Sequence, residues 1–198
     1  MEAMREKVIV MADKMYEMLE LIEKGFMEHK AEFLNGAMVQ ERELNEMEKA
    51  LTGRVLGLSK TAKTDQERKC LIMWEQIVET LERMGDEAAN LIERIEIKNA
   101  EHLLFSDMGV IQFNETYGIM KKSVDMMRVF LKGKSEELKE RIIANGFQVK
   151  ELVERYRQEH TERLVRGLCT PIAANMYFDM LDFTGNLARH ASNIVKLF

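Results

Sequence analysis

The stretch LERMGDEAANLIERI, residues 81–95, decides the fold, because it reads as a strong amphipathic helix that keeps a glycine near its middle. Residues spaced three or four apart lie on the same face of a helix. On one face of this helix lie Leu81, Gly85, Ala88, Ile92 and Ile95. A glycine inside a helix costs about 1 kcal/mol relative to alanine. We therefore expect Gly85 to lie on the buried face, where a missing side chain lets a neighbouring helix approach closely.

The helical period of this stretch extends along nearly the whole chain. Apolar stripes predict six helices. The stripes run through residues 8–26, 38–58, 71–95, 120–130, 149–164 and 176–194. The pattern breaks near residues 29–30, in SKTAKTDQER (59–68), in HLLFSDMG (102–109), in LKGKSEE (131–137) and in RGLCTP (166–171). The third helix is expected to continue past His102. A single proline and few β-branched runs argue against a sheet protein.

Two of these breaks carry the signals of a helix start. Thr64 is followed three residues later by Glu67, a spacing at which side chains and backbone N–H groups bond reciprocally as a capping box. Thr170 followed by Pro171 combines an N-cap residue with the first helical position, where proline is well tolerated. We expect helices to begin at both places.

The two halves of the chain resemble each other. Each has two long helices, a short loop and a third helix that ends in small residues followed by Asn-Leu or Asn-Ile. The endings GDEAANLIERI and ARHASNIVKLF align Gly85 with Ala188 and Asn90 with Asn193. We interpret this similarity as an internal duplication of about 100 residues.

The duplication sets the predicted architecture. Repeat 1 comprises residues 1–105 and repeat 2 comprises residues 106–198. Amphipathic helices joined by short connectors pack as antiparallel bundles. The predicted fold is all-α: one domain, residues 1–198, forms a six-helix bundle from two three-helix pseudo-repeats.

Composition and charge narrow the class of protein. The 198 residues carry a formal net charge of −5, with 32% charged and 46% apolar residues, which is typical of a globular protein. The acidic balance disfavours nucleic acid as a partner, since nucleic acid needs a basic surface. No apolar run approaches the roughly 20 residues of a membrane helix. The N-terminus, MEAMREKVIVMADK, does not read as a signal peptide.

The sulfur-containing residues indicate a buried core in a reducing compartment. Cys70 and Cys169 lie far apart within apolar helical patterns, so we expect buried, reduced thiols of a cytoplasmic protein. The sixteen methionines are first of all expected to fill the core, while a few exposed ones would suit a partner surface. A Met-rich bundle of this kind is compatible with a homodimer.

An acidic row runs along the helix of the opening stretch. It consists of Glu75, Glu79, Glu82, Asp86 and Glu93. Such a row is usually the solvated face of an amphipathic helix. A metal site is the alternative, because Glu82 and Asp86 are four residues apart and point the same way, as carboxylates that share a hard cation do. Glu41 supports this alternative, since it falls on an apolar stripe where a lone acid is costly to bury.

The motifs of the common enzyme classes are absent from the sequence. None of His29, His102, His160 and His190 follows a glutamate by three residues, which argues against the paired Glu-x-x-His of di-iron bundles. The sequence also lacks zinc spacings of Cys and His, a Gly-rich phosphate loop, and a nucleophile beside a base. These absences argue against those types of site, and we expect His160 and His190 to make ordinary helix-surface or interhelix contacts.

Three strings of residues carry a family resemblance. LERMGDEAAN (81–90) resembles the signature of PhoU-like proteins, a Leu-Glu-Arg-Ile-Gly-Asp-x-Ala-x-Asn string on the third helix of a three-helix repeat. ERELNEME (41–48) resembles the family's other acidic string. HTERLVRGLCTPIAANMYFDMLDF (160–183) resembles the branch that is fused to, or acts with, sodium/phosphate cotransporters. The resemblance covers nearly the whole chain.

The resemblance implies a function and a set of ligands. It implies a non-enzymatic, regulatory bundle that acts in phosphate homeostasis through a phosphate transporter, as a separate chain or as part of the same polypeptide. Its place would be the cytoplasm, at the inner face of the membrane. Some members bind multinuclear iron or zinc clusters, for which the matching residues in repeat 1 are Glu41, Glu82 and Asp86, with Asn45 where an Asp is common.

Repeat 2 departs from the family pattern. The Glu and Asp of its signature would fall on Gly185 and Arg189. Its upstream acids would fall on Gly146 and Lys150, or on Lys150 and Glu154 in a second register. A full second metal cluster is not expected in either register, because Arg189 would bring a positive charge into it.

Overall fold

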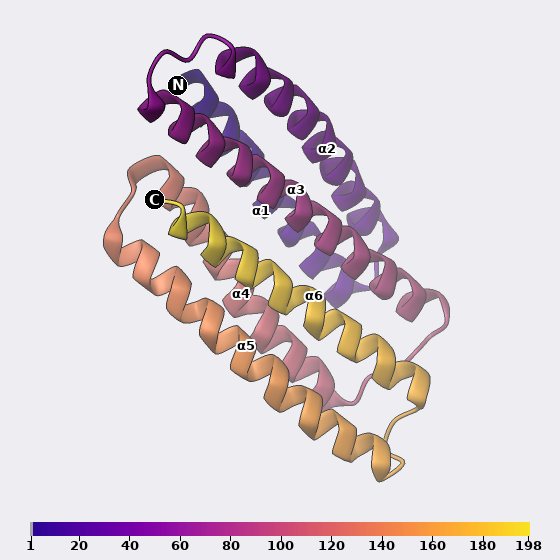
Figure 1. Cartoon of the computed structure of the whole chain (residues 1–198). Helices are drawn as coiled ribbons and strands as arrows, with labels where there is room; N and C mark the ends of the chain where they lie inside the picture. The colour runs from indigo at the N-terminus through magenta and orange to yellow at the C-terminus, as the bar shows by residue number, and fades with distance from the viewer. Residues whose placement is uncertain (1) are drawn as a thin grey trace.

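The computed structural model describes residues 2–198 and consists of six helices (Figure 1). They are α1 (Glu2–Glu28), α2 (Ala31–Ser59), α3 (Asp65–Ala100), α4 (Asp107–Gly133), α5 (Glu136–Val165) and α6 (Pro171–Lys196). No strand occurs among the described residues. The prediction of an all-α chain with six helices is confirmed.

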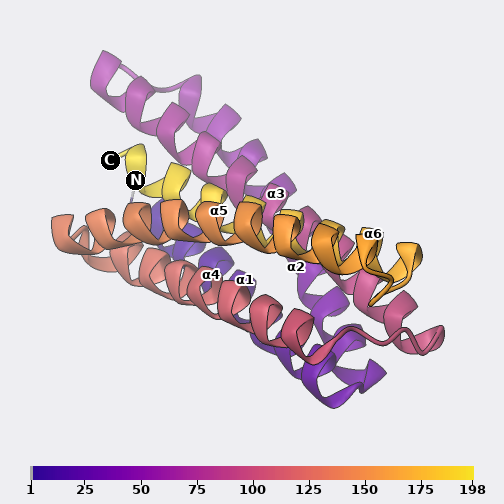
Figure 2. The same cartoon turned by 90° about the horizontal axis from the view of Figure 1, so that it is seen from below.

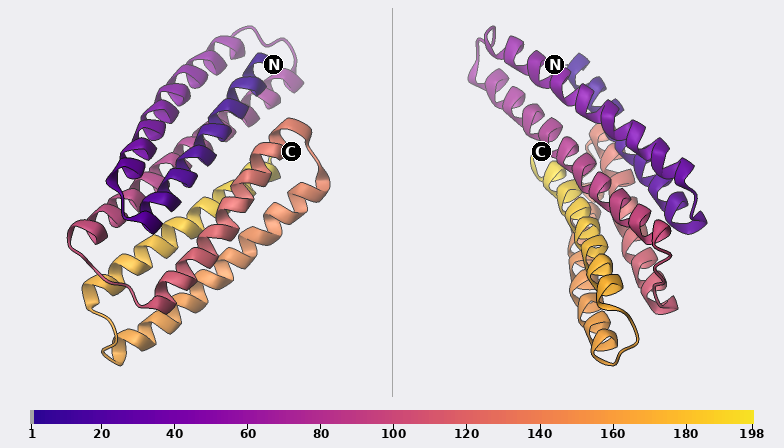
Figure 3. Two further views of the ribbon diagram at one scale, coloured as in Figure 1. Left: turned by 180° about the vertical axis from the view of Figure 1, so that it is seen from behind. Right: turned by 90° about the vertical axis from the view of Figure 1, so that its right-hand side faces the viewer.

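The helices form two antiparallel triplets. Helices α1, α2 and α3 pack together on one side of the molecule, and α4, α5 and α6 pack together on the other (Figures 1 and 3). Figure 2 shows α4 and α5 side by side, joined by a short turn. The triplets meet where α3 packs on α6 and α1 packs on α4. The predicted repeat boundary falls in the connector between α3 and α4.

The caps explain where the helices begin. Thr64 Oγ1 accepts a hydrogen bond from the Glu67 N–H at 3.2 Å, and Glu67 Oε2 accepts one from the Thr64 N–H at 3.0 Å. This is the predicted capping box. Thr170 caps α6 through the Ala173 N–H, with Pro171 at the start of the helix. Both predicted helix starts are confirmed.

Residues with positive φ mark three helix ends. His29 follows α1, His102 follows α3 and Lys134 follows α4, with φ values of 56°, 52° and 50°. The predicted turn at residues 29–30 is confirmed. The prediction that the third helix continues past His102 is wrong, because α3 ends at Ala100 and the left-handed backbone at His102 turns the chain toward α4.

The core contains the apolar stripes of both repeats. Fully buried methionines contribute to it from α1, α3, α4 and α6: Met11, Met15, Met18, Met84, Met120, Met127 and Met180. Their role as core filler is confirmed. Cys70 and Cys169 are free thiols, but both are partly exposed, so the prediction that they are buried is wrong. No helix within residues 2–198 combines the length and apolar character needed to cross a membrane.

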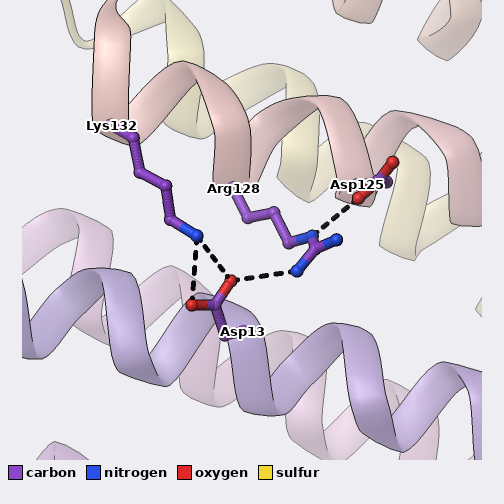
Figure 4. A network of polar contacts seen from close by, with 4 residues as sticks. All are labelled: Asp13, Asp125, Arg128 and Lys132. Atoms are coloured by element: carbon purple, nitrogen blue, oxygen red, sulfur yellow. Dashed lines mark hydrogen bonds and ion pairs between the residues drawn. The ribbon is translucent and has the colours of Figure 1, made fainter.

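Ion pairs join the two repeats along α1 and α4 (Figure 4). Asp13 of α1 accepts from Arg128 Nη1 and from Lys132 Nζ of α4, each at 3.2 Å. Arg128 also donates to Asp125 at 2.6 Å. These side chains are partly exposed, so each pair contributes at most about 1 kcal/mol. They therefore fix orientation more than they add stability.

The glycines show where helices approach closely. Gly85 lies on the buried face as predicted, but a Cβ added there would lie 3.4 Å from Leu44 Cδ1 of α2, so alanine would fit. The tighter position in repeat 2 is Gly146 of α5, where an added Cβ would overlap the Ser192 hydroxyl of α6. The close packing of α5 on α6 therefore requires a glycine at Gly146, whereas the packing of α2 on α3 does not require one at Gly85.

These two glycines should respond oppositely to alanine. We expect Gly85→Ala to raise the free energy of unfolding by up to about 1 kcal/mol, because it adds helix propensity without a clash. Gly146→Ala should lower it by roughly 1–3 kcal/mol, because Ser192 must move from its hydrogen bonds to Ile142 O and Ala188 O. Urea unfolding followed by circular dichroism measures both values. A larger loss at Gly85 would contradict this description.

Candidate functional site

The acids predicted as metal ligands lie on two neighbouring helices. Glu41 is on α2, and Glu82 and Asp86 are on α3, which packs against α2. Glu41 and Glu82 are partly buried, whereas Asp86 is exposed. Leu44 of α2 faces Gly85 of α3, so the two acidic strings lie on adjoining parts of the α2–α3 surface.

The surroundings of Glu82 make its carboxyl harder to ionise. Burial raises the pKa of its carboxyl, and the negative charges of Asp86 and Glu48 raise it further. Glu48 was not among the predicted site residues. It lies seven residues after Glu41, two helical turns along the same face of α2, and this spacing is the sequence signal that would have found it.

Asn45 occupies the place where the family often has an acid. Its Nδ2 donates to Glu41 Oε1 at 2.5 Å. Its Oδ1 is buried, and no described residue donates a hydrogen bond to it. Within residues 2–198, no group of three or more His, Cys, Asp or Glu side chains is placed to hold a metal ion. The side chains as arranged do not fit a multinuclear cluster, and metal binding at Glu41, Glu82 and Asp86 stays a prediction.

The corresponding surface of repeat 2 is a cleft between α5 and α6. The cleft has a volume of about 650 Å³. The four positions that replace the family's acids all line it: Gly146, Lys150, Gly185 and Arg189. A Cβ added at Gly185 would lie 3.5 Å from Val153 Cγ2, which matches the proximity of Glu82 to Glu48 in repeat 1. This match favours the register with Gly146 and Lys150.

The two histidines of repeat 2 are buried between helices. His160 is 1% exposed and stacks on Tyr177 of α6, with ring centroids 4.3 Å apart. His190 is 6% exposed. Burial lowers the pKa of each to about 4, and neighbouring arginines add to the effect. Both imidazoles are therefore neutral at pH 7, and His160 makes the predicted interhelix contact.

Comparison with known proteins links this arrangement to a family. The PhoU domain model matches residues 8–95. PhoU from Pseudomonas aeruginosa has a similar structure, with a TM-score of 0.92 and 15% identity over 99% of this chain and 93% of that chain. The phosphate transport system regulatory protein PhoU from Streptococcus pneumoniae gives a TM-score of 0.86 and 12% identity over 99% of this chain and 91% of that chain.

A more distant structure has the same type of fold. A PhoU-like protein from Shewanella oneidensis gives a TM-score of 0.60 and 11% identity over 98% of this chain and 96% of that chain. No curated protein matches the sequence significantly. The domain match includes the strings at residues 41–48 and 81–90, and the structural matches agree with the PhoU-like fold. Residues 8–95 therefore match the PhoU domain, and all six helices adopt the fold of solved PhoU structures.

Proposed function

We propose that this protein is a non-enzymatic regulator of phosphate uptake that acts through a phosphate transporter at the cytoplasmic face of the membrane. The observation that carries the proposal is structural similarity to PhoU proteins along 99% of the chain, together with the PhoU domain match. One of these proteins is a phosphate transport system regulator. The sequence resemblance to the branch associated with sodium/phosphate cotransporters supports a transporter of that type.

The proposal also names the part of the molecule that contacts the transporter, which we call the docking end. Figures 1 and 3 show the α1–α2 turn, the α3–α4 connector and the α5–α6 connector at one end of the molecule. Large apolar side chains are exposed there: Met27, Leu104, Met108, Ile111, Val165, Leu168 and Ile172. Leu104 and Leu168 are 87% and 65% exposed. Apolar groups concentrated in this way are typical of a surface that binds a protein partner.

A cellular experiment tests the regulatory role. Deleting the gene should change phosphate uptake, or its response to external phosphate, relative to the parent strain. Reintroducing the wild-type gene should restore the original response. Unchanged uptake in the deletion strain at both high and low phosphate would contradict the proposal.

Metal binding by the carboxylates of repeat 1 is the second candidate function. Two features favour it. A cation would offset the repulsion among the acids around Glu82, and it would give the buried Asn45 Oδ1 a partner. The ligands would be Glu41, Glu82 and Asp86, with iron or zinc as the metal. Elemental analysis of protein purified without chelators should then find stoichiometric metal, and its absence would reject this candidate.

Replacement of Glu82 distinguishes metal-free protein from metal-bound protein. In metal-free protein, Glu82→Gln should raise the free energy of unfolding by roughly 0.5 kcal/mol, because it removes like-charge repulsion at i,i+4 spacing. In metal-bound protein the same change should lower both metal content and stability. Glu93→Gln is the matched control, since Glu93 is exposed on the same helix. Equal effects of the two substitutions would contradict this description of Glu82.

A further inference from the structure

The cleft between α5 and α6 has two glycines in its walls. Gly146 and Gly185 occupy the positions that correspond to Glu41 and Glu82 of repeat 1. The volume of the cleft, about 650 Å³, is within the size range of small-molecule sites in proteins. Repeat 2 has thus replaced an acidic surface with a hollow.

The lining of this cleft carries an excess of positive charge. Four cations line it, Lys150, Arg157, Arg189 and Lys196, against two acids, Glu154 and Asp182. The excess of two positive charges stands out in a chain whose formal net charge is −5. A concave surface with one sign of charge concentrates ligands of the opposite sign.

The acids leave two of these cations available. Asp182 is engaged by Arg157, and Glu154 lies 3.9 Å from Lys150 in an exposed pair. Arg189 donates to the side-chain oxygen of Asn186 at 3.2 Å. No described carboxylate lies within ion-pair distance of Arg189 or Lys196.

A third acid, Glu87, lies near the cleft and already accepts a hydrogen bond. Glu87 of α3 accepts a hydrogen bond from Asn186 Nδ2 at 3.0 Å and does not line the cleft. The positive charge of Arg189 lowers the pKa of Glu87, although burial raises that pKa more strongly. The guanidinium of Arg189 is exposed toward the cleft side of α6, where a ligand can reach it.

The remaining lining is apolar. Phe147 lies at the cleft and is 63% exposed, which is unusual for a phenylalanine. Ile143 and Val153 contribute aliphatic surface beside it. An exposed aromatic ring next to free cations suits a ligand that has both a flat organic part and an anionic part.

We propose that the α5–α6 cleft binds a small phosphorylated organic molecule, with its phosphate groups at Arg189 and Lys196 and its organic part on Phe147. Arginine is well suited to this contact, because its planar guanidinium donates two parallel hydrogen bonds to phosphate oxygens. The site lies outside the acidic surface of repeat 1 and the docking end. It goes beyond the proposed regulatory function and can fail independently of it.

Calorimetric titration of the full chain tests the proposal, with ATP and adenosine as probes in EDTA-containing, magnesium-free buffer. ATP should bind with a Kd below about 1 mM, and adenosine should bind at least about tenfold more weakly. ATP binding should weaken as salt is added, because exposed charges are screened. No ATP binding up to the millimolar range, or equal binding of adenosine, would overturn the proposal.

Three variants locate the site. Arg189→Gln should weaken ATP binding at least about tenfold. Gly185→Glu should abolish binding, because it fills the cleft and adds a negative charge beside the cations. Arg54→Gln is the matched control, since Arg54 is exposed on α2. Circular dichroism confirms that each variant is folded. Equal weakening by Arg54→Gln and Arg189→Gln, or full binding by a folded Gly185→Glu, would overturn the assignment.

Discussion

Lowering the pH from 7 to 4 is expected to destabilise the fold by several kcal/mol, through His160 and His190. The folded pKa of each is about 4, below the ordinary value of 6.5. Between these values the unfolded chain binds more protons than the folded chain, so stability falls as the pH falls. A difference of this size corresponds to about 3 kcal/mol for each histidine.

Two carboxyls oppose this trend. Burial raises the pKa of Glu82 and of Glu87, so the folded state takes up their protons more readily than the unfolded state. Their contribution to stability therefore rises as the pH falls. The histidines should still dominate, because both are almost completely enclosed and both are displaced to a pKa of about 4.

The pH dependence can be assigned by substitution. Urea unfolding between pH 4 and pH 7 should give a steep rise in the free energy of unfolding with pH. His160→Gln and His190→Gln should each flatten that rise, whatever their effect at pH 7. His102→Asn should leave it unchanged, since His102 is exposed and asparagine tolerates its positive φ. Equal slopes in all four proteins would refute the assignment.

Trp74→Ala should be the most damaging single substitution considered for this protein, with a loss of roughly 3–5 kcal/mol. Trp74 of α3 is 4% exposed and packs edge-on against Phe198, with centroids 5.9 Å apart. Phe198 packs in the same way against Phe130 of α4 at 5.4 Å. The three rings connect repeat 1 to repeat 2, so their loss should weaken the whole molecule.

This aromatic cluster also tests the prediction of one domain. We expect one unfolding transition, with the fluorescence of the only tryptophan and the circular dichroism of all helices changing together in the wild-type protein. Trp74→Ala should shift that transition without splitting it. Two separate transitions would show that residues 1–105 and 106–198 unfold independently.

Much of the fold could be predicted from local signals. The capping box at Thr64 and the Thr170–Pro171 start act within one helical turn, so the sequence alone specifies them. The end of α3 is not predictable in this way, because no glycine or proline marks it and the left-handed backbone at His102 belongs to the turn toward α4. Periodicity places Gly85 on the buried face but does not encode distances between helices, so it cannot show that the tighter contact is at Gly146.

The candidate sites were only partly predictable. The i,i+4 spacing identified Glu82 and Asp86 as neighbours, but Glu48 comes from another helix and required the packing of α2 on α3. The register identified Gly185 and Arg189 as departures from the family pattern. It could not show that they border a cleft, because a cavity depends on which side chains from α5 and α6 fail to meet.

Association with a phosphate transporter tests the central claim most directly. The tagged protein should be purified from detergent-solubilised membranes of its own host, with the phosphate transporter identified in the eluate by mass spectrometry. We expect the wild-type protein and Leu56→Ser to retain the transporter and Leu168→Ser to lose most of it. Leu56 is 56% exposed near the far end of α2, so it matches Leu168 in kind and exposure. A folded wild-type protein that retains no phosphate transporter would contradict the account.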